Sequence, residues 1–397
     1  MHGEKTFGIW PNRERRQEHE LRTWPNGLLD KMGVEIEDMN VSRYIDTVEL
    51  KFDVEFVTPC FLGGANGNAE IRVAPFKNLL RRWWRIANGN LSPEELWKKE
   101  SRLFGSTEKY PDIVEENKRL PKEKRKPEIF GKSKVELKLL EISPKDNYTC
   151  SEKIFIGKNE NTDLALYTGY GSVNMGKTYI KNQTNCSFIL SCPTKNEFEF
   201  EKTLFCMHLF GTIGSRSRNG WGAISVQPKS FKFDPQKYFP TSVLLEEVMH
   251  NSKNYPYCIG KDEKGLLCWQ TVERYRSWTS AFEDIATVYH QLVSTLNEDD
   301  KKYKTKWRYL LGFAKANERL PSQLLLKICT VKTKTSSGVI QKQYFGQIVH
   351  APYRIEGWNE EKYGNQLDAW KYIHEYLDGD PALKGMFGRN VKGGTAK

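Results

Sequence analysis

Residues 47–64 read TVELKFDVEFVTPCFLGG, and residues 75–87 read PFKNLLRRWWRIA. In the first stretch apolar and charged residues alternate from Val48 to Phe56, which is the period of a strand with one buried face. In the second, apolar residues recur at helical spacing from Phe76 to Ala87, and Pro75 suits a first helical turn. The small residues at 63–67 predict a turn between them. The segment therefore predicts a strand, a turn and a helix in succession.

Further elements extend this start. The sequence from Ser92 to Glu95 is a capping box that predicts a second helix ending at Gly105. Alternating or short apolar runs predict strands at 135–139, 187–191 and 223–226, and a helix is expected at 201–210. The order strand, helix, strands, helix, strand is that of a split βαβ or ferredoxin-like module.

After about Lys232 a similar pattern begins again. Helices are expected at 271–295, 306–317 and 360–377, and strands at 324–330 and 343–349. We therefore expect an α+β fold with two ferredoxin-like (RRM-like) domains, the second more helical. The expected parts are a charged N-terminal extension at 1–46, a first domain with a glycine-rich loop at 47–230, and a second domain at 231–397.

Charge is unevenly distributed along the chain. The net charge of the 397 residues is +11, and residues 72–134 hold 17 Lys and Arg against 9 Asp and Glu. Such an excess favours a polyanion as partner, because each neutralised phosphate releases counterions. The alternative is a solvated surface, especially for the basic segment at 120–126.

The composition also indicates a cellular location. No apolar run approaches the roughly 20 residues that span a bilayer, and Met1 to Arg16 lacks the apolar segment of a secretory signal. The cysteines form no CxxC pair, which favours reduced thiols over disulfides or zinc. We expect a cytoplasmic protein without membrane contact; its eight cysteines are Cys60, Cys150, Cys186, Cys192, Cys206, Cys258, Cys268 and Cys329.

The strongest local signal is GTIGSRSRNGWG at 211–222. Glycines there would let the backbone approach a ligand, and exposed amides suit phosphate oxygens. Arg216 and Arg218 could add bidentate phosphate contacts, and Trp221 could stack on a base. The alternative is a tight turn whose arginines pair with nearby carboxylates.

The helix at 76–87 carries a basic face beside its tryptophan-rich stripe. Trp83 and Trp84 fit a core better than a stacking surface. The basic face lies near the Gly63-Gly64 turn in sequence, which favours binding of a nucleic-acid backbone over mere solvation. Its members are Lys77, Arg81, Arg82 and Arg85.

Two catalytic or cofactor signals are weak. Residues 171–178 match the P-loop pattern GxxxxGK[ST], but the residues after Thr178 are poor helix formers, and a P-loop needs a helix there. No histidine has metal-ligand spacing. His208, just before the glycine loop, is the one candidate for general acid–base cleavage of RNA, but it falls on the apolar side of its helix. We expect no cofactor, metal, catalytic residue or small-molecule substrate.

The chain resembles the RAMP superfamily of CRISPR-associated proteins, and most of all the first-numbered subunits of Cmr (type III-B) effectors. Three stretches carry the resemblance: 58–86 with its glycine turn and KNLLRRWWR helix, the FGS element at 104–106, and the glycine loop at 211–222. Asn219 departs from the family pattern, which often has a second arginine there.

The resemblance implies a non-catalytic, RNA-binding subunit at the head of a multisubunit complex. It would help to hold the 3′ part of the guide RNA and the facing target RNA, beside other RAMP subunits, in antiviral defence. Other RAMP proteins cut RNA beside a similar loop, so a metal-independent guide-processing endoribonuclease is the alternative, and a pure assembly scaffold is a third. Close backbone approach to RNA is expected at Gly63, Gly64, Gly214, Gly220 and Gly222.

Overall fold

The computed structural model describes residues 46–107, 111–124, 131–159, 161–250, 258–315, 318–334 and 338–391. The N-terminal extension expected at 1–46 lies outside these residues except for Asp46. The basic segment at 120–126 lies partly outside them, and its residues Lys122–Lys124 form a short 3₁₀ turn.

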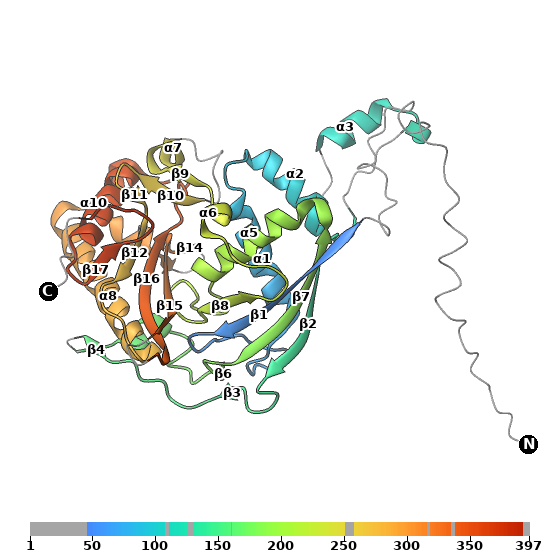
Figure 1. Ribbon diagram of the computed structural model, residues 1–397. Coiled ribbons are helices and arrows are strands. Elements are labelled where there is room, and N and C mark those ends of the chain that lie inside the picture. Colours follow the sequence, from blue (N-terminus) through green and yellow to red (C-terminus); the bar gives the residue numbers. More distant parts are fainter. Residues whose placement is uncertain are drawn as a thin grey trace, which may run out of the picture. The chain divides into compact units, whose positions relative to one another are not determined.

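The first sheet is built as the alternating pattern predicts. Its strands are β1 (Thr47–Phe56), β2 (Glu136–Ser143), β7 (Asn185–Pro193) and β8 (Ile224–Pro228), in the spatial order β2-β7-β1-β8 with antiparallel pairing throughout. Helix α1 (Val73–Ala87) follows β1, and helix α5 (Glu197–Phe210) joins β7 to β8 (Figure 1). This order and connectivity are those of a ferredoxin-like module.

Burial of one face of β1 and one stripe of α1 accounts for this packing. Leu50, Phe52, Val54 and Phe56 point into the core, while the charged residues between them stay outside it. On α1, Trp83 and Trp84 are at most 1% exposed, as expected for core residues. Each fully buried large apolar side chain stabilises the fold by roughly 1.5–3 kcal/mol.

Further helices and short strands are inserted between the strands of this module. Helix α2 (Pro93–Phe104) has the predicted capping box between Ser92 and Glu95 and ends at Gly105. Helix α3 (Pro111–Arg119) follows it. Between β2 and β7 the chain forms β3 (Thr149–Cys150), β4 (Lys158–Asn159), β5 (Thr162–Asp163), α4 (Leu164–Gly169) and β6 (Tyr179–Ile180).

The second half repeats the same topology. Strands β12 (Cys268–Thr271), β15 (Leu324–Lys334), β16 (Ile340–His350) and β17 (Leu383–Gly385) lie in the order β15-β16-β12-β17, and helices α8 (Trp278–Tyr303) and α10 (Gln366–Gly379) make the two crossings. The expected α+β fold with two ferredoxin-like modules is therefore confirmed. Between the modules lie α6 (Pro235–Tyr238), β9 (Ser242–Leu244), α7 (Leu245–His250), β10 (Ile259–Asp262) and β11 (Gly265–Leu266).

Three expectations for the second half were wrong in detail. The helix expected at 306–317 is not formed over its described residues: Trp307–Leu311 is a 3₁₀ turn, and β13 (Phe313–Lys315) pairs with β14 (Glu318–Leu320). The helix expected from residue 271 begins at Trp278, because Cys268–Thr271 joins the sheet. The helix expected at 360–377 is interrupted at Gly364, which separates α9 (Glu360–Tyr363) from α10.

The two modules share packing across their boundary. Trp221, from the first module, lies against Phe282 of α8 with ring centroids 5.0 Å apart. Residues 47–397 form one compact unit, and a division near residue 231 stays a prediction. All eight cysteines are unpaired. No helix within the described residues has the length and apolar character needed to cross a membrane.

Candidate nucleic-acid interface

The outward face of the first sheet does not offer the aromatic platform of an RRM. At its centre β1 presents Glu49, Lys51, Asp53 and Glu55, and the facing positions of β7 are polar or aliphatic. Asp53 accepts a hydrogen bond from Ser187 and pairs with Lys229 at 2.8 Å, and Glu55 pairs with Lys342 of β16. RRM-type binding stacks bases on sheet aromatics, which this face of the sheet does not present.

The glycine-rich loop at 211–222 connects the end of α5 to β8 and is tied down on both sides. The Ile213 amide donates to the Gly222 carbonyl at 2.9 Å, and the Ser215 amide donates to the Phe61 carbonyl at 2.8 Å. On the other side, the Arg218 guanidinium donates to the Ser322 carbonyl of the second module. The loop is therefore a fixed joint between the two modules.

Three predicted contacts in this loop are corrected by burial. Trp221 is 0% exposed, lies between Phe61 and Phe282, and donates its indole N–H to Thr168 Oγ1 at 3.2 Å. It therefore cannot stack on a base. Gly220 and Gly222 are also buried, and they serve internal packing rather than RNA. A Cβ at Gly222 would lie 1.9 Å from the Ile213 carbonyl oxygen.

Three loops meet on the exposed side of this joint. The Ala69 amide donates to Thr178 Oγ1 at 2.6 Å, which joins the Gly63 turn to the loop after α4. Ser172 Oγ lies 3.2 Å from Ser215 Oγ, which joins that loop to the glycine-rich loop. We call residues 63–69, 170–178 and 214–216 together the three-loop surface.

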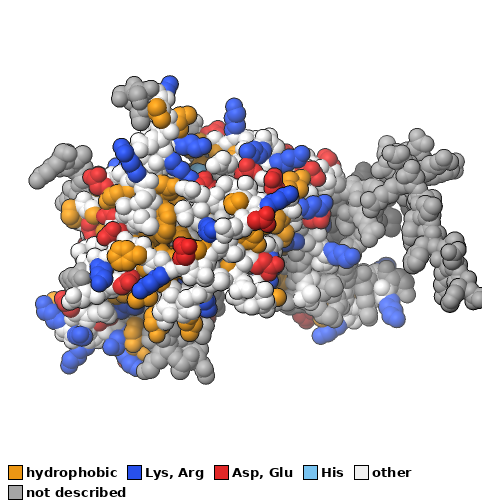
Figure 2. Space-filling view, turned by 90° about the horizontal axis from the view of Figure 1, so that it is seen from below, with side chains coloured by type: hydrophobic (Ala, Val, Ile, Leu, Met, Phe, Trp, Pro, Cys, Tyr) orange, Lys and Arg blue, Asp and Glu red, His pale blue; other side chains and the backbone are white. Residues whose placement is uncertain are grey.

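Cationic and hydrophobic side chains reach solvent on the three-loop surface. Arg216 is exposed and held at φ 58°, and within the described residues its guanidinium has no hydrogen bond or ion pair. Lys177 is also exposed, as are Tyr170 at 65% and Met175 at 70%. Figure 2 views the protein from the side of β3 and β6, where hydrophobic side chains are interspersed with Lys and Arg and with Asp and Glu.

The remaining predicted glycines differ in what surrounds them. Gly63 is exposed, and a Cβ built there meets nothing within 4 Å. Gly64 leaves room for Glu70, whose carboxylate would lie 2.5 Å from such a Cβ. Gly214, at φ 91°, lets the loop pass the Phe61 carbonyl. Of the three, Gly63 has the open backbone that close approach by a phosphate requires.

The basic face of α1 is occupied by internal contacts. Arg81 and Arg85 both pair with Glu100 of α2, whose side chain is 5% exposed. Lys77 donates to Ser133 Oγ at 3.0 Å and to the Val135 carbonyl at 2.9 Å, and burial lowers its pKa. Arg82 lies over the Trp83 ring. These cations hold α1 in place, and phosphate contact by them stays a prediction.

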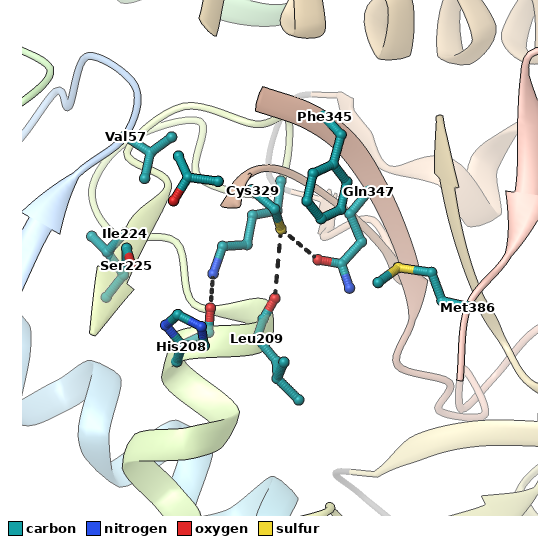
Figure 3. Close-up of a pocket in the computed structure, with 11 residues that line it drawn as sticks. Val57, His208, Leu209, Ile224, Ser225, Cys329, Phe345, Gln347 and Met386 are labelled. Carbon is teal, nitrogen blue, oxygen red and sulfur yellow. Dashed lines mark hydrogen bonds between the residues drawn. The ribbon is translucent and has the colours of Figure 1, made fainter. Parts of the chain in front are cut away.

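His208 lines a small cavity between the modules rather than a cleft (Figure 3). The cavity holds about 80 Å³, far below the roughly 300 Å³ of a typical ligand pocket. Lys327 donates to the His208 carbonyl, and the Cys329 thiol donates to Gln347 Oε1 at 2.9 Å. Burial, and then the charge of Lys327, lower the pKa of His208 to about 4. The surroundings of this imidazole are those of a packed structural residue and differ from those of a catalytic group in a cleft.

Sequence reasoning missed Tyr170 and Lys177. Lys177 lies in the stretch that matches the P-loop pattern, and the residues after Thr178 form the short strand β6 in place of a helix. Tyr170 stood in no motif at all. A usable signal existed, since the 170–178 stretch combines an aromatic, two glycines and a lysine with no acidic residue.

The first ferredoxin-like module and its glycine-rich loop lie in a region that is similar to a known family. Residues 53–225 match the model of the RAMP superfamily, so the resemblance is confirmed over that region. Among solved structures, the apo form of Cmr1 from Pyrococcus furiosus is similar at 12% identity and a TM-score of 0.44, over 85% of this chain and 98% of that one. No curated protein matches significantly.

Proposed function

We propose that this protein is a non-catalytic RNA-binding subunit of a type III-B (Cmr) CRISPR effector complex. In this role it holds the 3′ part of the guide RNA, the facing target RNA, or both, at the head end of a cytoplasmic antiviral ribonucleoprotein. The RAMP region at 53–225 and the three sequence motifs support the family role. The three-loop surface supports RNA as the ligand.

One observation carries the proposal. Arg216 reaches solvent from the strained turn of the glycine-rich loop, without a partner in the described part of the chain. A left-handed conformation at a non-glycine residue is energetically costly and persists where the surrounding structure enforces it. An arginine held outward in this way presents its full fork of donors to a phosphate.

Charge complementarity extends beyond Arg216. Residues 63–69, 170–178 and 214–216 contain no Asp or Glu, and Lys177 adds a second exposed cation. At the edge of this surface Glu70 lies against Gly64 and pairs with Arg72 at 3.7 Å. A phosphate backbone laid on the loops would meet the cations of Arg216 and Lys177. Electrostatic binding of this kind falls steeply as salt increases.

The first experiment is co-purification of the tagged chain from its host, with sequencing of the bound RNA. Recovery of CRISPR spacer RNA with several RAMP-like proteins is expected. Recovery of protein partners that survive RNase treatment, with no RNA contact, would favour the scaffold alternative. Discrete fragments from labelled RNA in chelator, lost in His208→Ala, would favour the endoribonuclease.

The second experiment tests the site. Arg216→Glu should weaken RNA binding across sequences and reduce the slope of log affinity against log salt by about 0.7 or more for single strands. Lys301→Glu on α8, outside the three-loop surface, makes the same charge change and should leave that slope unaltered. Equal slopes for the two variants would contradict the proposed site.

A further inference from the structure

Tyr170 combines an exposed ring with a rigid support. We infer that Tyr170 is a stacking platform for an unpaired RNA base, so that the three-loop surface takes single-stranded RNA in preference to a duplex. This inference rests on the proposed function and specifies the ligand of the same surface. No family motif quoted above includes this residue.

The support of Tyr170 comes from the glycine-rich loop itself. Tyr170 is the residue that ends α4, two positions after Thr168. The Thr168 carbonyl accepts from Asn219 Nδ2 at 2.9 Å, and its hydroxyl accepts from the Trp221 indole at 3.2 Å. The hydroxyl also donates to the Leu164 carbonyl at 2.7 Å. Asn219 and Trp221 of the glycine-rich loop thus fix the end of α4.

Asn219 therefore has a role that differs from the arginine of the family pattern. Its amide holds Thr168, and through it the position of Tyr170, instead of reaching solvent as a second phosphate ligand. A ring whose base is fixed loses little conformational freedom when a nucleobase stacks on it. At this departure from the motif, the Asn219 side chain supports the end of α4.

The ring of Tyr170 is available for stacking. It is 65% exposed, and it has no ring contact or hydrogen bond within the described residues. The nearby Tyr167, by contrast, packs against Tyr289 and His290. Every base has a face that can stack on such a ring, and the interaction tolerates any sequence.

Two cationic side chains belong to the same loop surface as Tyr170. A Cβ at Gly171, the residue after Tyr170, would be 3.3 Å from Arg216 Nη2, so the arginine runs directly past this backbone. Lys177 closes the same loop. An aromatic ring next to cations, in a segment free of carboxylates, is the arrangement of single-strand binding surfaces.

Single-stranded RNA fits this surface better than a protein partner. Exposed Met175 and Leu166, at 70% and 36%, could contribute to a protein interface, but the centres of such interfaces are depleted of charge. Here the three-loop surface carries the exposed cations Arg216 and Lys177, and residues 170–178 contain no carboxylate. A duplex keeps its bases stacked on one another, so their faces are closed to Tyr170.

The test measures fluorescence anisotropy of the full chain with three labelled probes: an RNA single strand, its duplex, and the same strand with abasic sugars. The proteins are wild type, Tyr170→Ala, Tyr170→Phe and Arg216→Ala. We expect Tyr170→Ala to lose about tenfold in affinity for the single strand, and Tyr170→Phe to stay near wild type. Wild type should bind the abasic strand as weakly as Tyr170→Ala binds the normal one.

The outcomes separate the two proposals. If wild type binds none of the probes, the RNA-binding function fails. If Arg216→Ala weakens binding while Tyr170→Ala does not, or if wild type binds the duplex as tightly as the single strand, the function stands and the stacking inference falls. Loss of a co-purified protein in Tyr170→Ala, with RNA affinity unchanged, would identify a protein contact instead. Equal melting temperatures of Tyr170→Ala and wild type would confirm that the exposed ring is not needed for folding.

Discussion

The Arg218 guanidinium donates a hydrogen bond to the carbonyl of Ser322, 104 residues further along the chain. In the same place the Leu326 amide donates to the Arg218 carbonyl at 2.9 Å. Two residues earlier, Arg216 has no such partner within the described structure and lies in solvent. Two arginines that look equivalent in the sequence thus have different roles, one in the joint between modules and one on the three-loop surface.

Arg218→Ala should therefore act on stability. Removing the guanidinium leaves the Ser322 carbonyl without this donor, and we expect a loss of about 1–3 kcal/mol in the free energy of unfolding. Arg216→Ala, the matched control, should change it by less than about 0.5 kcal/mol. Urea titration followed by tryptophan fluorescence measures both. If Arg218→Ala kept its stability and bound RNA more weakly, Arg218 would belong to the binding surface and not to the joint between the modules.

Glu100 should be the anchor of α2 on α1. Its buried carboxylate accepts from Arg81 and Arg85, and Glu100→Gln leaves two guanidinium groups beside a neutral amide. We expect the free energy of unfolding to fall by about 3 kcal/mol. Glu94→Gln removes an exposed pair with Lys98 and should cost less than about 1 kcal/mol. Similar losses for the two variants, measured by urea unfolding, would exclude a special role for Glu100.

Acid should destabilise the protein through His208. Its pKa is about 4 in the folded state and 6.5 ordinarily, so the unfolded chain binds more protons between these values. Stability is therefore retained above pH 6.5 and lost as the pH falls toward 4. From pH 7 to pH 5 we expect His208 to account for a loss of about 2 kcal/mol.

His208→Gln isolates this contribution. His350 and His374 are buried, and their pKa values are lowered in the same direction, so wild type and variant share that background. The variant should lose about 2 kcal/mol less than wild type between pH 7 and pH 5, by urea unfolding at each pH. If the free energy of unfolding changed with pH in the same way in both proteins, protonation of His208 would not destabilise the fold.

Gly63 and Gly222 should separate binding from folding. Gly63 is open and has no left-handed φ, so Gly63→Ala should fold with an unchanged melting temperature. If RNA approaches this backbone, the added methyl should reduce RNA affinity severalfold. Gly222→Ala should fail to fold, because φ is 64° and its Cβ would overlap the Ile213 carbonyl. Soluble expression and thermal melting of both variants check this, and a well-folded Gly222→Ala would contradict the structure.

Sequence patterns correctly predicted the helices and strands that are determined by neighbouring residues in the chain. The alternation in 47–56 marked both ends of β1, and the Ser92–Glu95 capping box marked the start of α2. The prediction of a helix at 306–317 was wrong because the apolar spacing there fits a 3₁₀ turn as well as a helix. The strand that follows depends on pairing with β14, which no helical pattern reveals. Pairing with residues later in the chain determined that this segment forms a strand.

The candidate site was predictable only in part, for the same reason. The glycine-rich loop and Arg216 stood out by composition, but the burial of Trp221 depends on Phe282, which lies 61 positions later. Helical periodicity placed Arg81 and Arg85 off the apolar stripe, yet could not show that α2 brings Glu100 against them. Asn219 and Trp221 hold the end of α4 at Thr168, two positions before Tyr170, and no local pattern reveals these contacts.

The joint between the modules also bears on the order of events during synthesis. Residues 211–222 leave the ribosome well before Phe282, Ser322 and Leu326, the partners that enclose Trp221 and fix Arg218. Until those later residues emerge, the nascent loop lacks the contacts that enclose Trp221 and hold Arg218. The joint between the modules can therefore close only after the strand that carries Leu326 has been made.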